Sequence, residues 1–212
     1  YELGKRGGSF PDHLKSEAVD LLLEISGVHL IRPTIPAPVI VMDGSARTMS
    51  WGFRRSFAPK VKGRAPVMRT IVNSREDKLD GRMWKKAFAE SRCIIPAFSF
   101  FEWVDDHGKK VPLRFSRPGD GWLWIAGIWE DHEDHGECFS MNTTEPNDVV
   151  EPVHDRMPAV LQESQIAPYL AGELNEFGPS AVGLEFAESA NFLKPTHKED
   201  PDLPLRFGPT ES

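Results

Sequence analysis

The chain has 212 residues and a formal net charge of −7, with 40% hydrophobic and 27% charged residues. This size and composition are typical of one globular domain, and no apolar run is long enough to cross a bilayer, so a membrane partner is not expected. The polar opening residues lead us to expect no signal peptide, and two cysteines, Cys93 and Cys138, do not make a disulfide framework, so a cytoplasmic location is expected.

Taken in chain order, apolar residues at helical spacing predict a first helix over residues 14–25, which ends at Gly27. Further short helices are predicted over 84–89, with Asp80 as a cap, over 147–150 and over 165–171, where Pro168 is tolerable only in the first turn. Short apolar runs between prolines and glycines predict strands over 39–42, 49–53, 69–73, 93–96, 98–104, 113–115, 122–129, 138–143 and 159–161.

Many short strands with a few interspersed helices predict the fold class. We expect a single α+β domain over residues 1–193, with a largely antiparallel, barrel-like β-sheet and several short flanking helices. Residues 194–212 are rich in proline and charge, and this tail is expected to have little structure of its own.

Charge is distributed unevenly along the chain. The charged residues between positions 51 and 75 are all basic, whereas acids dominate positions 130–151. A net negative charge argues weakly against a nucleic-acid partner, although this division could present one basic face. From charge alone, two solvated surfaces are the favoured interpretation.

Two polar segments follow or interrupt apolar strands. In residues 70–76 a strand would project Asn73 and Arg75 on the same face. In residues 93–103, Glu102 stands between aromatic residues, which should disfavour its charged form and raise its pKa. A carboxyl group of this kind suits general acid or base catalysis near neutral pH.

Two more polar segments lie later in the chain. Residues 143–147 form a polar turn, and residues 153–158 set His154, Asp155 and Arg156 side by side before another strand. Taken singly, all four segments are more simply explained as turn-forming or solvated residues.

Together, the order and spacing of the four segments resemble the SRAP (SOS response-associated peptidase) family, from about residue 1 to about residue 172. Members of that family carry a strand ending in Asn-Ala-Arg-x-Glu, a segment ending in Glu-Trp, a Thr-Thr-x-Ala-Asn turn and a His-Asp-Arg-Met-Pro segment. This chain has the corresponding residues Asn73 to Glu76, Cys93 to Trp103, Thr143 to Asn147 and His154 to Pro158, and also a Trp51-Gly52 pair and an Ile31 to Thr34 loop.

The resemblance implies recognition of abasic sites in single-stranded DNA. In the family, an N-terminal cysteine exposed by autocatalytic removal of the initiator methionine attacks the ring-opened sugar, and a thiazolidine crosslink results. Carried over, Glu102 would be the acid/base for methionine removal, proton transfer and crosslink reversal. His154 would act on the deoxyribose, and Asn73 would orient the reactive terminus.

The resemblance also implies a DNA-binding surface. Arg75 and Arg156 would hold backbone phosphates, which gives affinity without sequence preference. Candidates for a wedge that stacks on a neighbouring base are Phe57 and the loop of Pro33 and Thr34, whereas Trp51 is expected in the core. No cofactor and no metal are implied, and a monomer is expected.

The chain departs from the family pattern at several positions. It begins with Tyr1-Glu2-Leu3, so the reactive cysteine and the initiator methionine are expected just ahead of Tyr1 in the full-length protein. Neither Cys93 nor Cys138 could replace that cysteine, because neither has a free α-amine. Ser99 stands where the family usually has glycine, and Pro146 replaces a common alanine.

Three alternatives stay open at this point. The first is a single-stranded DNA or lesion-binding module with no covalent step. The second is a general peptidase using Glu102 and His154, although no nucleophile elbow or metal motif is present. The third is a metal site within residues 132–138, for which a solvated hairpin is the better interpretation because no second cluster supplies the remaining ligands.

Overall fold

A computed structural model describes residues 1–4, 9–25, 27–59, 61, 63–119 and 121–190, so the tail predicted over 194–212 lies outside the described residues. The strand pairings close five strands into a barrel in the order β12-β4-β3-β8-β11 and back to β12. All of these pairings are antiparallel except β12–β4. The barrel strands are β3 (Pro36–Val41), β4 (Ala46–Trp51), β8 (Arg92–Ala97), β11 (Leu123–His132) and β12 (Gly136–Thr144).

Three short strands extend the barrel where the candidate site residues lie. The strand β7 pairs in parallel with β12, β13 pairs with β12, and β14 pairs with β11. These strands are β7 (Asn73–Arg75), β13 (Met157–Pro158) and β14 (Val160–Leu161). The ladder therefore places two sequence-distant polar segments on either side of the end of β12.

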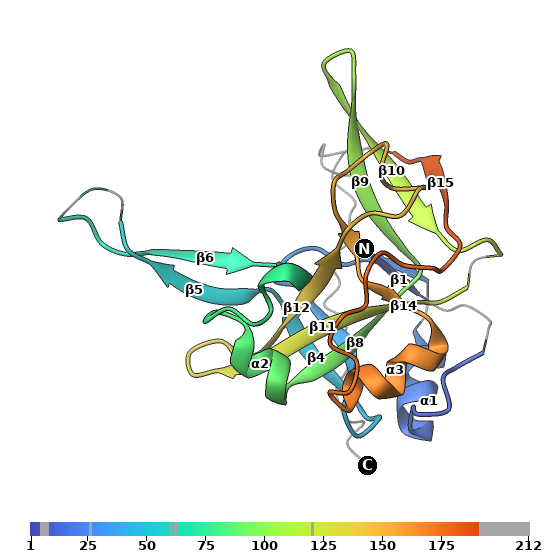
Figure 1. The fold of residues 1–212 in the computed structure, drawn as a ribbon, viewed down its shortest axis with the longest axis horizontal. Coiled ribbons are helices and arrows are strands. Elements are labelled where there is room, and N and C mark those ends of the chain that lie inside the picture. The colour runs from blue at the N-terminus through green and yellow to red at the C-terminus, as the bar shows by residue number, and fades with distance from the viewer. Residues whose placement is uncertain (5–8, 26, 60, 62, 120, 191–212) are drawn as a thin grey trace.

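A second sheet has the order β15-β10-β9-β1-β2. It is continuous with the barrel because β8 runs through Phe98 into β9. Its strands are β1 (Glu2–Gly4), β2 (Val28–Leu30), β9 (Ser99–Asp106), β10 (Lys109–Ser116) and β15 (Glu185–Glu188). The β9–β10 hairpin projects from the body at the top of Figure 1.

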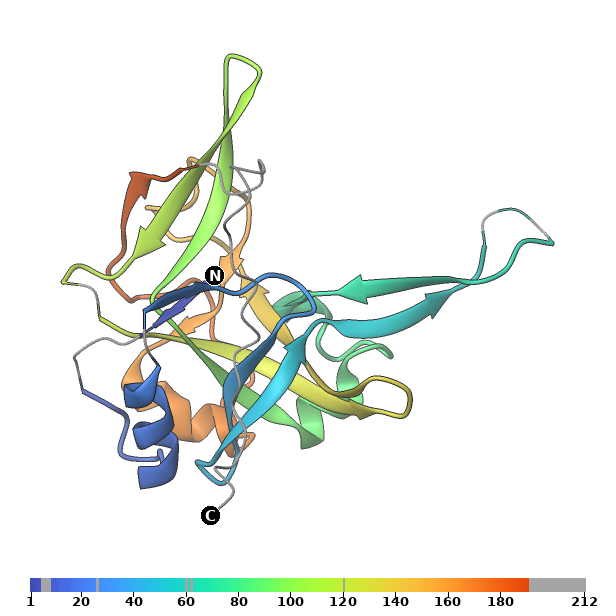
Figure 2. The ribbon, with the colours of Figure 1, turned by 180° about the vertical axis from the view of Figure 1, so that it is seen from behind.

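A separate two-stranded ribbon consists of β5 (Phe53–Phe57) and β6 (Val67–Ile71). It leaves the barrel directly after β4 and stands away from the body as an arm, seen from both sides in Figures 1 and 2. We call these two strands and the turn between them the arm. The chain returns from β6 through Val72 into β7, so the arm is joined directly to the strand that carries Asn73.

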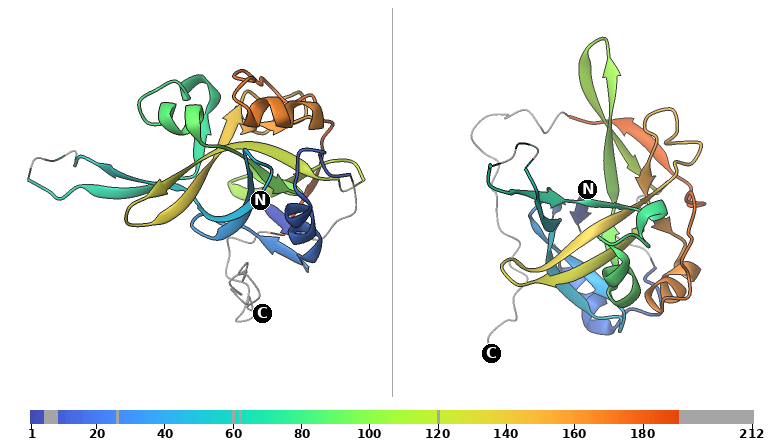
Figure 3. Two further views of the ribbon diagram at one scale, coloured as in Figure 1. Left: turned by 90° about the horizontal axis from the view of Figure 1, so that it is seen from below. Right: turned by 60° about the vertical axis from the view of Figure 1, so that its left-hand side comes forward.

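The helices are short and lie outside the barrel. α2 and α3 lie on one side of it, as Figures 1 and 3 show. The helical segments are α1 (Ser16–Glu24), the 3₁₀ turn η1 (Glu76–Lys78), α2 (Lys85–Glu90) and α3 (Glu163–Leu170). No helix in the described ranges is long and apolar enough to span a membrane.

The core fills the barrel with aromatic and β-branched side chains. Trp124, Phe139 and Tyr169 are each at most 1% exposed. The run Leu123 to Ile128 is buried throughout, because this barrel strand has neighbours on both faces. Burial of these apolar side chains is the main force that closes the barrel.

The predicted α+β fold, with a largely antiparallel, barrel-like sheet and short helices, is confirmed, while some elements were wrong. Residues 148–150 form a turn and not a helix, and Trp84 rather than Asp80 stands at the start of α2. Pro168 lies in the second turn of α3. The helix ends two residues later, and the Pro168 carbonyl accepts the amides of Glu173 and Leu174 (2.9 and 3.1 Å) at this end.

Candidate functional site

A cavity of about 700 Å³ opens between the end of the barrel and the second sheet. Its lining includes Asn73 and Arg75 of β7, Glu102 of β9, and His154 and Arg156 from the segment before β13. The structure thus brings together five side chains that are spread over more than eighty positions of the sequence.

β7 is held in place by a chain of buried hydrogen bonds below the cavity. The Ser74 hydroxyl donates to Asn142 Oδ1 (2.7 Å), and the Asn142 amide donates to the Tyr169 hydroxyl (2.8 Å). That hydroxyl donates in turn to the Gly127 carbonyl (2.8 Å). Because Ser74 points into the core, the strand alternation turns Asn73 and Arg75 outward.

Glu102 and His154 face each other across the cavity, with 3.9 Å between Glu102 Oε2 and His154 Nε2. The side chains are 23% and 42% exposed, so both can be reached from solvent. Burial raises the pKa of the Glu102 carboxyl group, the nearby His154 opposes this shift, and Asp155 adds to it. The direction is the one expected from the aromatic neighbours in the sequence.

The His154 ring is oriented by its own loop. Its Nδ1 lies 3.0 Å from the Arg156 amide nitrogen and 2.9 Å from the Arg156 carbonyl oxygen, so it has a backbone partner in either tautomer. Asp155 Oδ1 also lies 3.3 Å from Nδ1. With Nδ1 occupied, Nε2 is the ring nitrogen directed at Glu102. The pair can therefore exchange protons with a molecule bound in the cavity beside them.

Two arginines flank Asp77 at the edge of the cavity. Arg75 donates to both Asp77 oxygens (2.9 and 3.0 Å), and this contact raises the pKa of Arg75 and lowers that of Asp77. An Arg156 nitrogen lies 3.9 Å from the same carboxylate and donates to the Thr143 carbonyl. Arg156 Nε is buried and has no hydrogen-bond partner within the described residues. The hydrogen-bonding capacity of this guanidinium is therefore not filled within the described residues.

A second cavity, of about 620 Å³, lies on the other side of these arginines and shares Arg75 and Arg156 with the first. Glu76 stabilises the wall of this second cavity, because one of its carboxylate oxygens accepts the amides of Phe177 and Gly178 (2.6 and 3.1 Å). The other accepts the Thr144 hydroxyl (2.6 Å). Five carboxylates, those of Glu76, Asp77, Asp80, Glu145 and Glu176, also line this second cavity, so its charged lining is acidic overall.

The start of the described chain lies at the cavity. Tyr1 lines it and exchanges two backbone hydrogen bonds with Ile31 (2.8 and 3.2 Å), which extends the β1–β2 ladder by one residue. The Tyr1 ring is buried, contacts Trp51 edge to face (5.3 Å between centroids), and its hydroxyl has no partner in the described part of the chain. Burial raises the pKa of the Tyr1 hydroxyl.

The remaining sequence candidates are separated. Pro33 lines the cavity, whereas Thr34 beside it does not. Thr34 has a φ of +73° and its amide donates to the Trp51 carbonyl (2.7 Å), so it shapes the loop. Phe57 lies at the outer end of the arm, in a different, smaller cavity.

Sequence analysis missed Asp77 and the apolar wall of the cavity. Trp51, expected in the core, is half-buried, and it lines the cavity together with Phe101 and Met141. Its indole nitrogen donates to the Val72 carbonyl (3.0 Å), next to Asn73. The aromatic run around Glu102 was a signal for such a wall, but Asp77 has no signal beyond its place two residues after Arg75.

The alternative metal site has no support in the geometry. No group of three or more His, Cys, Asp or Glu side chains in the described ranges could hold a metal ion, although the His132 and His135 rings lie 4.8 Å apart. Both thiols are buried and neither lines the cavity. Burial raises the pKa of Cys93, and raises that of Cys138 to about 11. Both thiols thus stay protonated near neutral pH.

Known proteins share the sequence pattern and the fold. The family described as SOS response associated peptidase (SRAP) matches residues 23–192. The abasic site processing protein YoqW of Bacillus subtilis is 28% identical over 173 residues, with 76% of this chain and 75% of that protein covered. The abasic site processing protein YedK of Escherichia coli is 26% identical, with 57% and 56% covered.

Solved structures agree with the fold. A protein from Bacteroides thetaiotaomicron has a TM-score of 0.66 at 18% identity, with 84% of this chain and 85% of that chain covered. A protein from Bordetella bronchiseptica has a TM-score of 0.61 at 23% identity, with 75% and 86% covered.

Proposed function

Because the chain belongs to the SOS response associated peptidase (SRAP) family, we propose that it processes abasic sites in DNA, with Asn73, Glu102 and His154 as its reactive centre. The observation that carries this proposal is the convergence of the three side chains on one cavity at which Tyr1 also lies. The relatives named as abasic site processing proteins support the same substrate class.

We propose further that the reaction is covalent and uses a cysteine ahead of Tyr1 as the N-terminal residue, freed by autocatalytic removal of the initiator methionine. Its amine adds to the aldehyde carbon of the ring-opened sugar, and loss of water gives a Schiff base. The thiol then adds to the C=N bond, and its proton passes to nitrogen, which closes a thiazolidine. The Tyr1–Ile31 backbone pair supports this because it directs the chain toward the cavity.

The proposed proton carriers match these steps. Addition of the amine needs a base for the ammonium proton and an acid for the departing hydroxyl. The raised pKa of Glu102 makes its protonated form more accessible, so this carboxyl group can both give and take a proton. His154 Nε2, which faces Glu102, serves the sugar oxygen during ring opening, and the Asn73 amide hydrogen-bonds and orients the attacking group.

The proposed DNA contacts are backbone contacts to single-stranded DNA. Arg156, with its unpaired buried Nε, and Arg75 would bind the phosphates next to the lesion, and the Pro33 loop would stack on a neighbouring base. A non-covalent lesion-binding module with the same arginines is the second candidate, and the unpaired Arg156 Nε favours anion binding in either case.

The two candidates are separated by incubating the full-length protein with single-stranded DNA that contains an abasic site, followed by denaturing electrophoresis. A heat-stable adduct is expected, and none is expected with DNA whose abasic aldehyde has been reduced to an alcohol. Binding at equilibrium without any adduct would support the non-covalent module instead. Intact mass gives an independent test, because a mass equal to that of the 212 residues alone would rule out the cysteine.

A further inference from the structure

The arm carries several basic side chains, and among its described residues only Arg55 is paired with a carboxylate. Residues 51–75 contain seven basic side chains and no carboxylate. In the ribbon, Arg55 pairs directly with Arg69, so two like charges stand opposite each other on one face, which is unfavourable. Glu130 neutralises Arg55 through two hydrogen bonds, one of 2.6 Å. Within the described residues, no ion pair to a carboxylate is found for Arg69 or for Arg64 near the tip.

The same face becomes aromatic and apolar toward the tip. The pairing places Phe57 opposite Val67 on the face that carries Arg55 and Arg69. The Arg69 guanidinium lies 5.4 Å from the centre of the Phe57 ring. An aromatic ring and a guanidinium plane thus stand together at the tip, and these are the two surfaces on which unstacked nucleobases pack.

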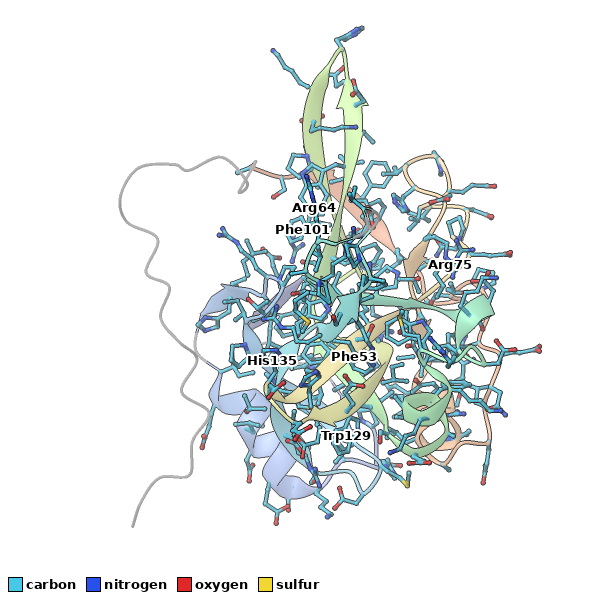
Figure 4. All side chains as sticks on the ribbon, turned by 90° about the vertical axis from the view of Figure 1, so that its left-hand side faces the viewer. Phe53, Arg64, Arg75, Phe101, Trp129 and His135 are labelled. Atoms are coloured by element: carbon cyan, nitrogen blue, oxygen red, sulfur yellow. The ribbon has the colours of Figure 1, made fainter. Side chains whose placement is uncertain are left out.

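These side chains border a small cavity of about 180 Å³, lined by Phe57, Val61, Arg64, Val67 and Arg69 among others. It is smaller than the roughly 300 Å³ at which cavities for drug-sized ligands begin. Val61 and Val67 are more than half exposed, so the apolar floor is open to solvent. Figure 4 looks along the arm toward the body and shows Arg64 on it, with Arg75 on the body behind.

We call the cavity lined by Asn73, Glu102 and His154 the lesion cavity. We propose that the tip of the arm binds one nucleotide of the single-stranded DNA that enters it, with the base against Phe57 and the phosphate on Arg64 and Arg69. This inference rests on the proposed function, because it assigns a second contact to the same strand. Continuity supports it, since β6 leads directly into β7 and the lesion cavity. The six residue steps from Val67 to Asn73 span roughly 20 Å in extended conformation.

The base of the arm is fixed to the barrel by side-chain contacts. Arg55 is bound to Glu130 of β11 and lies over the Phe53 ring (4.8 Å), and Arg54 donates to the Thr70 hydroxyl. A pre-positioned contact loses little conformational freedom on binding.

The test measures the affinity of the full-length protein for two fluorescent single-stranded oligonucleotides with a central abasic site reduced to the alcohol. An oligonucleotide of about five nucleotides extends only about 7 Å on each side at the stacked rise of about 3.4 Å, well short of the tip. One of about twenty nucleotides reaches it. Phe57→Ala is expected to weaken binding of the long oligonucleotide by about 5- to 100-fold, since base stacking contributes in this range, and to leave the short one unchanged.

Two further variants complete the design. Arg69→Gln is expected to lower the slope of log K against log salt concentration by about 0.7 on the long oligonucleotide alone. Met68→Ala is the matched control, because Met68 is 50% exposed on the same strand but pairs with Ser56 on the opposite face. It is expected to bind both oligonucleotides as the wild type does.

The outcomes separate the two proposals. If Phe57→Ala binds the long oligonucleotide as tightly as the wild type, the arm contact is refuted while the lesion cavity stands. The arm contact is also refuted if Met68→Ala weakens binding of the long oligonucleotide as much as Phe57→Ala does. It is refuted too if sedimentation at the concentrations used shows self-association that depends on the arm. If wild type and Arg156→Gln bind the short oligonucleotide equally weakly, it is the proposed function that fails.

Discussion

Replacement of Glu102 by glutamine tests the reactive centre through two properties that respond to the same carboxyl group. Burial is the main cause of its raised pKa, so the charged form is less favourable in the folded than in the unfolded chain. The stability linked to this group is therefore fully present below the unfolded pKa of about 4.3 and is lost as the pH rises through the folded pKa. The glutamine variant has no carboxyl group at this position, so it does not lose this stability as the pH rises.

We therefore expect Glu102→Gln to be more stable than the wild type at neutral pH, with a difference that disappears below about pH 4. The side chain is 23% exposed and lies 3.9 Å from His154 Nε2, so the gain is reduced by solvent and by the lost attraction to a protonated imidazole. Denaturant unfolding at several pH values measures it. A neutral-pH difference that persists unchanged at low pH would contradict the assigned pKa direction.

The same variant should lose chemistry but keep affinity. A positioned acid or base contributes about 10²- to 10⁴-fold, so crosslink reversal should slow by this factor and lose the pH dependence that Glu102 gives it. Binding to reduced abasic DNA should be nearly unchanged, because the proposed phosphate contacts belong to Arg75 and Arg156. A variant that reverses at the wild-type rate, or that loses binding in proportion, would refute the role.

Three more substitutions test an ion pair near the cavity and two contacts that hold the fold together. Asp77→Asn should tighten single-stranded DNA binding and steepen its salt slope by about 0.7, because it frees Arg75 for phosphate; unchanged titrations would contradict this. Arg92→Met should lower the free energy of unfolding by about 3 kcal/mol in denaturant melts, since it strands three carbonyls and one amide oxygen. Gly52→Ala should lower it by about 1–3 kcal/mol, because its φ is +117° and a methyl group would overlap Thr70; wild-type melting of either variant would contradict the prediction.

Local features were predictable from sequence, and features that depend on closure of the barrel were not. The raised pKa of Glu102 followed from its aromatic neighbours, which the strand keeps nearby in any fold. The buried chain from Ser74 through Asn142 to Tyr169 was invisible, because its members are far apart in sequence and meet only when β7 pairs with β12. That chain is nevertheless what turns Asn73 toward the cavity.

The predicted strand over 69–73 overlaps β6, whereas β5 of the arm was missed for a different reason. β5 alternates Phe53, Arg55 and Phe57 on one face without a buried face beyond the base of the arm, so the period-two pattern that marks a half-buried strand is absent. The departure from the family pattern at Ser99, in contrast, is explained by a contact with Glu2. Ser99, which departs from the family's usual glycine, donates to Glu2 (2.6 Å) beside Arg114, so the substitution is accommodated by a contact between β1 and β9.

The net charge of −7 was a weak argument against a DNA partner, and the structure shows why total charge misleads here. Charges on the surface act over roughly 10 Å at 0.1 M salt, so only neighbours of the binding surface matter. Two acids of the β11–β12 hairpin, Glu130 and Glu137, are paired with Arg55 and Arg47. Near the tip of the arm, residues 56–69 contribute only basic charges. The net charge of the whole chain is therefore no argument against the proposed phosphate contacts at the tip of the arm and at Arg156, because the field that a DNA strand would meet is set by the side chains along the proposed path.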